Sequence, residues 1–216
     1  MRIQFGGPPA ARPPTAGVDA GRPIRQPGRW TSALLALMAG VLCMSIPISL
    51  FILHSAFHPE GYPESTIDKP ALPWGGIVVV MVLSILAHEL LHAVLYPDSG
   101  LSDSTIFFMQ WTRLRFGVYY EGVIPRARWL AMRLLPAVAL TFFSVLAYFL
   151  LFERMTLALE TYLIIIILTN SLGSGADLVA AAIVLRQVPA DGALHFHRGK
   201  AYWLPGTGSV GADGAE

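Results

Sequence analysis

The sequence predicts an all-α integral membrane protein with about four transmembrane helices and a short β-hairpin-like loop at the cytoplasmic interface. Of its 216 residues, 54% are hydrophobic and only 13% are charged, whereas a soluble domain has about 25% charged residues. Several apolar stretches reach the ~20 residues that a helix needs to cross a bilayer. A lipid bilayer is therefore the environment expected for this chain.

The elements follow from the apolar pattern along the chain. Residues 1–29 contain Pro, Gly and Arg without sustained apolar periodicity, which predicts a flexible cytoplasmic arm. The long apolar stretches predict four spans, at about residues 30–53, 74–96, 129–152 and 157–185. The polar C-terminal part predicts a short strand at 200–204 and a flexible tail at 206–216.

The loop between the second and third spans has a different composition. Residues 105–120 are rich in aromatic and β-branched side chains with partial alternation, which is typical of strands. Arg113 and Arg115 interrupt this stretch, so it is not a span. We expect two short strands or an interfacial hairpin, to which an extended peptide could add as a further strand.

The distribution of positive charge predicts the orientation in the membrane. Twelve of the fifteen Lys and Arg residues lie in the N-terminal arm, the loop after the second span and the C-terminal tail. Because positive residues concentrate on the cytoplasmic side, both termini of this multi-pass protein are expected in the cytoplasm. Thirteen arginines against two lysines, with abundant Ala, Gly and Pro, favour a GC-rich bacterial source, and hence a bacterial cell membrane.

The second span contains the sequence His88-Glu89-Leu90-Leu91-His92, an H-E-x-x-H pattern. Two histidines four positions apart share one face of a helix and can bind one metal ion, and the glutamate can polarise a metal-bound water. Ionisable side chains at membrane depth cost at least ~2.5–3.5 kcal/mol each on insertion scales, so they rarely lack a function. The pattern predicts His88 and His92 as metal ligands; a polar cluster that packs helices or relays protons is the alternative.

A catalytic zinc site usually takes three protein ligands and a water, and the fourth span offers the third. Asn170 and Asp177 lie seven positions apart on a polar, small-residue face of this span. At a rise of 1.5 Å per residue, His88, His92 and Asp177 all lie roughly 8–14 Å from the cytoplasmic ends of their helices. We therefore predict Asp177 as the third ligand, with a helix-packing polar residue as the alternative.

The chemistry expected of such a site is hydrolytic. Zinc would lower the pKa of its water toward ~7, and Glu89 would take the proton and pass it to the leaving amine. Water must reach this depth, so a polar cavity open to the cytoplasm is expected. Asn170 could orient the substrate carbonyl or donate to the developing oxyanion, or it could serve only in interhelical hydrogen bonding.

At these motifs the chain resembles the DUF3267 family of zincin peptidases, bacterial membrane proteins of a similar plan. The resemblance spans roughly residues 31–205. The matching segments are His88-Glu-Leu-Leu-His-Ala-Val-Leu-Tyr-Pro97, Arg133-Leu-Leu-Pro136 and Asn170-Ser-Leu-Gly-Ser-Gly-Ala-Asp-Leu178. The family looks related to the site-2 intramembrane metalloproteases, which place H-E-x-x-H in one span and an Asp ligand in a later one. The resemblance implies a membrane metallopeptidase-like domain over residues 30–205.

The function expected from the sequence is that of an intramembrane zinc metalloendopeptidase that cleaves a membrane-associated protein or peptide near the cytoplasmic face. A non-proteolytic metal-binding scaffold or sensor is the alternative, although such a protein has no need of Glu89. A transporter that relays protons or metal is a third reading, but no internal repeat supports it. Nucleic-acid binding is not expected, because no basic stripe with interleaved aromatic residues lies outside the membrane loop. The ligand set also suits other divalent metals, and the oligomeric state is left open.

Overall fold

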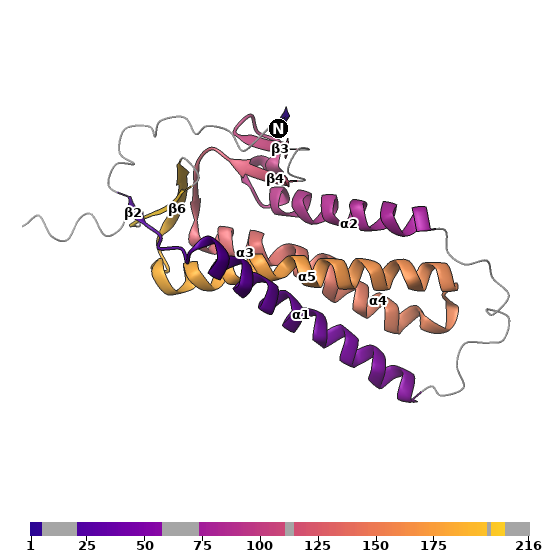
Figure 1. Cartoon of the computed structure of the whole chain (residues 1–216). Coiled ribbons are helices and arrows are strands. Elements are labelled where there is room, and N and C mark those ends of the chain that lie inside the picture. The colour runs from indigo at the N-terminus through magenta and orange to yellow at the C-terminus, as the bar shows by residue number, and fades with distance from the viewer. Residues whose placement is uncertain (6–20, 58–73, 111–114, 198–199, 206–216) are drawn as a thin grey trace, which may run out of the picture. The chain divides into compact units, whose positions relative to one another are not determined.

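The computed structural model describes residues 1–5, 21–57, 74–110, 115–197 and 200–205. The fold is mostly helical, and four of its helices are long and apolar enough to cross a membrane, as the sequence predicts. The first, second and fourth are α1 (Arg29–Phe57), α2 (Trp74–Val94) and α5 (Leu157–Gln187). The third span runs through α3 (Arg126–Pro136), the π-helix η5 (Ala137–Phe142), α4 (Phe143–Leu151) and the 3-10 turn η6 (Phe152–Arg154) (Figure 1).

Short strands form two small sheets. The first has the order β1-β3-β4, with β1 at Arg2–Phe5, β3 at Thr105–Gln110 and β4 at Arg115–Tyr120. The second has the order β2-β7-β6-β5, with β2 at Arg22–Pro23, β5 at Val123–Pro125, β6 at Ala193–His197 and β7 at Lys200–Leu204. Strands β3 and β4 pair antiparallel, which confirms the predicted hairpin, and β7 confirms the strand predicted at 200–204.

Two of these strands lie in the segment 1–29, which the sequence predicts as a flexible arm. Strand β1 pairs parallel with β3, and Arg2 donates to Glu121 at 2.7 Å and to the Asp103 carbonyl at 2.6 Å. Strand β2 pairs antiparallel with β7. The partners of both strands lie far away in the sequence, so the local pattern carries no signal for them. The predicted tail at 206–216 lies outside the described residues.

The chain divides into two compact units. The helical unit comprises residues 29–88 and 135–179, and the sheet unit comprises residues 1–28, 89–134 and 180–216. The divisions fall inside α2 and α5, so each of these helices contributes one part to each unit.

In the helical unit, α5 is the most enclosed element. About 33% of its most apolar stretch is buried, against 11–17% of the corresponding stretches in the other three spans. Close approach of α1 depends on glycine: a Cβ on Gly175 would collide with the Ala36 carbonyl oxygen, and one on Gly40 would collide with the Leu172 carbonyl oxygen. Small residues let membrane helices pack with their backbones near contact. Trp30 and Leu42 of α1 are 81% and 69% exposed, as expected for lipid-facing side chains.

The sheet unit has its own apolar core, which gathers the ends of three helices and the second sheet. Its buried members are Ile24, Ala93, Tyr96, Ile124, Trp129, Met132, Val184, Val188, Leu194 and Ala201. Between α2 and β3, the turn η3 (Pro97–Gly100) reverses the chain. Asp98, Ser99 and Gly100 have φ values of 55°, 53° and 74° there, in the left-handed region that L side chains seldom adopt.

Candidate metal centre

The two histidines of α2 lie on one buried face of an otherwise apolar helix. His88 is 9% exposed and His92 is 5% exposed, whereas Leu90 between them is 45% exposed. Positions four apart fall on the same side of a helix and a position two away falls on the opposite side. Leu90 therefore faces outward, and both imidazoles lie on the buried side of α2.

Asp177 of α5 lies close to both histidines. Its Oδ2 lies 3.0 Å from Nε2 of His88, and its side chain is buried. One ligand atom each from His88, His92 and Asp177 lies within 4.8 Å of the others, and within the described residues this is the one group of three or more His, Cys, Asp or Glu that could hold a metal. Tetrahedral zinc, with bonds of about 2.0–2.2 Å, places its ligands ~3.3 Å apart. The donor set and its spacing therefore fit a zinc ion.

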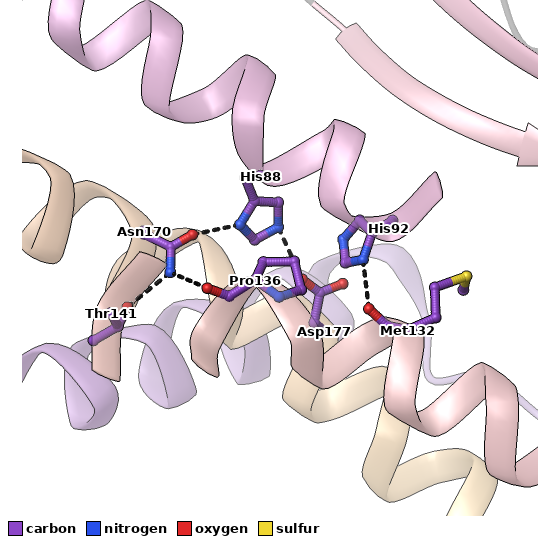
Figure 2. Close-up of polar contacts among 7 residues, drawn as sticks. All are labelled: His88, His92, Met132, Pro136, Thr141, Asn170 and Asp177. Atoms are coloured by element: carbon purple, nitrogen blue, oxygen red, sulfur yellow. Dashed lines mark hydrogen bonds and ion pairs between the residues drawn. The ribbon is translucent and has the colours of Figure 1, made fainter. Parts of the chain in front are cut away.

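Asn170 determines the orientation of His88 (Figure 2). Its Nδ2 donates to the Pro136 carbonyl at 2.9 Å and to Oγ1 of Thr141 at 2.7 Å. A carbonyl only accepts, so the other amide atom facing His88 must be oxygen. Oδ1 of Asn170 therefore accepts from Nδ1 of His88, at 2.7 Å. With its proton on Nδ1, the imidazole presents Nε2 toward Asp177.

His92 is held by a backbone carbonyl of the third span. Its Nδ1 lies 2.9 Å from the carbonyl oxygen of Met132, as Figure 2 shows. Because a carbonyl only accepts, Nδ1 carries the proton and Nε2 is the nitrogen left for a metal. Metal-binding histidines are commonly oriented in this way, by a hydrogen bond from the second ring nitrogen.

These contacts bear on the two roles considered for Asn170. Both donor contacts of its amide go to Pro136 and Thr141, and its acceptor goes to His88. It is 2% exposed. The geometry thus favours a residue that positions His88 over one that donates to an oxyanion.

Glu89, the expected acid and base, is half-buried and lies beside strand β4. A Cβ on Gly117 of this strand would be 3.7 Å from Oε2 of Glu89 and 2.8 Å from the ring of Phe108. Because glycine has no side chain, position 117 leaves space for the Glu89 carboxylate and the Phe108 ring. Sequence reasoning did not single out Gly117, because its importance depends on which helix the hairpin covers.

Tyr96 interacts electrostatically with both Glu89 and Arg133, and the sequence alone did not indicate this. Tyr96 is 7% exposed and its hydroxyl donates to the Val118 carbonyl at 3.3 Å. Burial raises the pKa of Tyr96 to about 12, with Arg133 acting to lower it and Glu89 to raise it. The Tyr96 hydroxyl therefore stays neutral at physiological pH. The guanidinium of Arg133 lies 5.2 Å from the centre of the Trp129 ring, in a cation–π contact.

His88, His92 and Asp177 thus form a group that could hold a metal ion, next to Glu89, in a chain with four helices long and apolar enough to cross a membrane. A family model described as "Putative zincin peptidase", DUF3267, matches residues 81–192. The match covers more than half of the chain and includes all the candidate ligands, so the chain belongs to this family. Comparisons with curated proteins and with solved structures gave no match.

Proposed function

We propose that this protein is an intramembrane zinc metallopeptidase that hydrolyses a peptide bond of a membrane-associated protein near the cytoplasmic face. The observation that carries the proposal is the convergence of His88, His92 and Asp177 beside Glu89. Three protein ligands and an adjacent carboxylate are the pattern of a catalytic zinc site rather than a structural one, because a structural site uses four ligands and needs no base.

Each residue has a distinct part in this chemistry. His88, His92 and Asp177 would hold the metal, which when bound supplies an acidified water and a Lewis acid for the scissile carbonyl. Glu89 accepts a proton and returns it to the leaving amine. Asn170 and the Met132 carbonyl hold the two imidazoles in the tautomer that presents Nε2.

Strand β4 is the proposed docking element for the substrate. Among the residues that the structure describes, β4 stands at the end of the order β1-β3-β4, whereas the other side of β3 is paired with β1. An extended peptide can add to an open sheet edge through main-chain hydrogen bonds. Glu89 lies beside β4 at Gly117, so a peptide paired along this strand would run past the acid and base.

The membrane setting of the proposal rests on the four apolar spans. With both termini in the cytoplasm, as the Lys and Arg distribution predicts, the candidate ligands lie in the cytoplasmic halves of α2 and α5. Water and substrate would then reach the centre from that side. The excess of Arg over Lys and the abundance of Ala, Gly and Pro, which favour a GC-rich bacterial source, support a bacterial cell membrane as the location.

The non-proteolytic scaffold or sensor is separated from the peptidase by Glu89→Gln. The protein is purified in detergent with zinc and incubated with a peptide library made from digested bacterial membrane proteins, and new N-termini are counted by mass spectrometry. A peptidase keeps its zinc in Glu89→Gln and loses cleavage by about 100-fold or more, since acid–base catalysis contributes roughly 10²–10⁴-fold. Equal peptide patterns from wild type and variant, with zinc bound in both, would refute the peptidase and favour the scaffold.

A further inference from the structure

Pro136 stands between the contacts that orient the two histidines. In an α-helix, the carbonyl of Met132 would accept from the backbone N–H four residues later, at position 136. Proline has no N–H, so this donor is absent from the helix. The Met132 carbonyl instead accepts from Nδ1 of His92, at 2.9 Å. The proline thus leaves an acceptor inside an apolar span, where the imidazole of another helix uses it.

The same residue immediately precedes the π-helix η5 (Ala137–Phe142). In an α-helix, positions five apart lie about 140° apart around the axis, whereas π-helical hydrogen bonds join positions five apart and stack them along it. The Pro136 carbonyl and the Thr141 hydroxyl, five positions apart, both accept from Nδ2 of Asn170. That amide in turn accepts from His88 through its Oδ1.

We propose that Pro136 is a positioning residue for the metal centre, which orients His92 through the Met132 carbonyl it leaves available and His88 through the acceptor pair that it forms with Thr141. The proposal rests on the proposed function, because the metal centre that Pro136 would position is the one that the proposed function assumes. It gives the third span, which supplies no ligand, a direct part in the site (Figure 2).

A matched proline exists in α1. Pro47 is also buried inside a membrane helix. It lines a largely apolar cavity whose wall includes Ile46 and Thr141, but the carbonyl that its missing N–H leaves without a helical donor is that of Cys43, four residues earlier in α1. Replacing either proline by alanine restores an N–H and improves helix propensity, so neither change is expected to prevent folding. Only at position 136 does the restored N–H compete with a histidine for its acceptor.

The test measures zinc affinity by chelator competition, and the visible spectrum of the Co²⁺-loaded protein, for wild type, Pro136→Ala and Pro47→Ala in detergent. Loss of an outer contact to a ligand typically costs about 10–100-fold in metal affinity. We expect that loss and a shifted Co²⁺ spectrum for Pro136→Ala, and neither for Pro47→Ala. Wild-type affinity and spectrum in Pro136→Ala would overturn the proposal, as would an equal loss in both variants.

A second pair of variants tests the contacts that connect Pro136 to His88 through Asn170. Thr141→Val removes the hydroxyl that Asn170 uses and should lower zinc affinity, whereas Thr141→Ser keeps the hydroxyl and should retain the affinity.

The Pro136→Ala change is also made in a His92→Ala background, with a weaker chelator. Because the route through His92 is absent in that background and only the route through His88 remains, Pro136→Ala should cost less affinity there than it costs in wild type; an undiminished loss would mean general distortion and would overturn the proposal. A folded wild type that binds no zinc would instead refute the proposed function itself.

Discussion

Nε2 of His88 and Oδ2 of Asp177 lie 3.0 Å apart although 89 positions separate them in the sequence. This contact joins the H-E-x-x-H turn of α2 to the polar face of α5. Both side chains are buried in a unit whose remaining surface is largely apolar, so their polarity cannot be explained by exposure to water. A metal ion bound by both would compensate the cost of burying them.

Removal of a ligand should remove the metal. We expect about one zinc per wild-type chain by mass spectrometry of the purified protein, and loss of affinity in Asp177→Ala and His92→Ala that exceeds the roughly 10–100-fold typical of outer contacts. Asp191→Ala, at an exposed turn residue, is the control and should retain zinc. Zinc retained by Asp177→Ala would show that the third ligand is another residue.

Gly117 should matter for turnover and not for metal binding. In Gly117→Ala the new methyl group meets the Phe108 ring at 2.8 Å and approaches Glu89, so β4 or the carboxylate must shift. A misplacement of about 1 Å can reduce rate by 10²-fold, and we expect a loss of about 10- to 100-fold in library cleavage with zinc content unchanged. Gly28→Ala, where a Cβ meets nothing within 4 Å, should cleave like wild type. Unchanged cleavage in Gly117→Ala would argue against β4 as the docking strand.

Gly175 should be required for the packing of α1 on α5. A Cβ there would meet the Ala36 carbonyl and the backbone of Gly40, and overpacking typically costs 1–3 kcal/mol, or about 2–4 °C in Tm for each kcal/mol. Gly175→Ala should therefore lower the thermal midpoint in detergent. Gly75→Ala, in α2 with open space around it, should be neutral or stabilising because alanine favours helix. Equal midpoints for the two variants would contradict the close α1–α5 contact.

The candidate site divides into parts that are visible in the sequence and parts that are not. His88 and His92 are visible because helical spacing alone places them on one face. Asp177 is visible because membrane spans have a known rise, which allows depths to be compared between helices. The contact of the Met132 carbonyl cannot be predicted from the sequence, since every residue carries a backbone carbonyl. Its availability depends on a proline four positions later and on α2 lying opposite.

The strands show the same division. The β3–β4 hairpin is predicted because its partners are adjacent in the chain and its composition is strand-like. Strand β1 is not, because it contains only four residues and its partner begins about a hundred positions later. Pairing between such distant segments is decided by the remainder of the fold, and a segment of four residues is too short for its local strand preference to predict the pairing.

The sequence by itself determined the membrane spans, the H-E-x-x-H turn and the candidate third ligand, because hydrophobic length and helical periodicity are local properties of a chain. Only the tertiary structure decided how the histidines are oriented, which strand lies beside Glu89 and what Asn170 contacts. Those features depend on backbone carbonyls and on glycine positions of separate elements, whose meeting is set by packing between segments far apart in the chain.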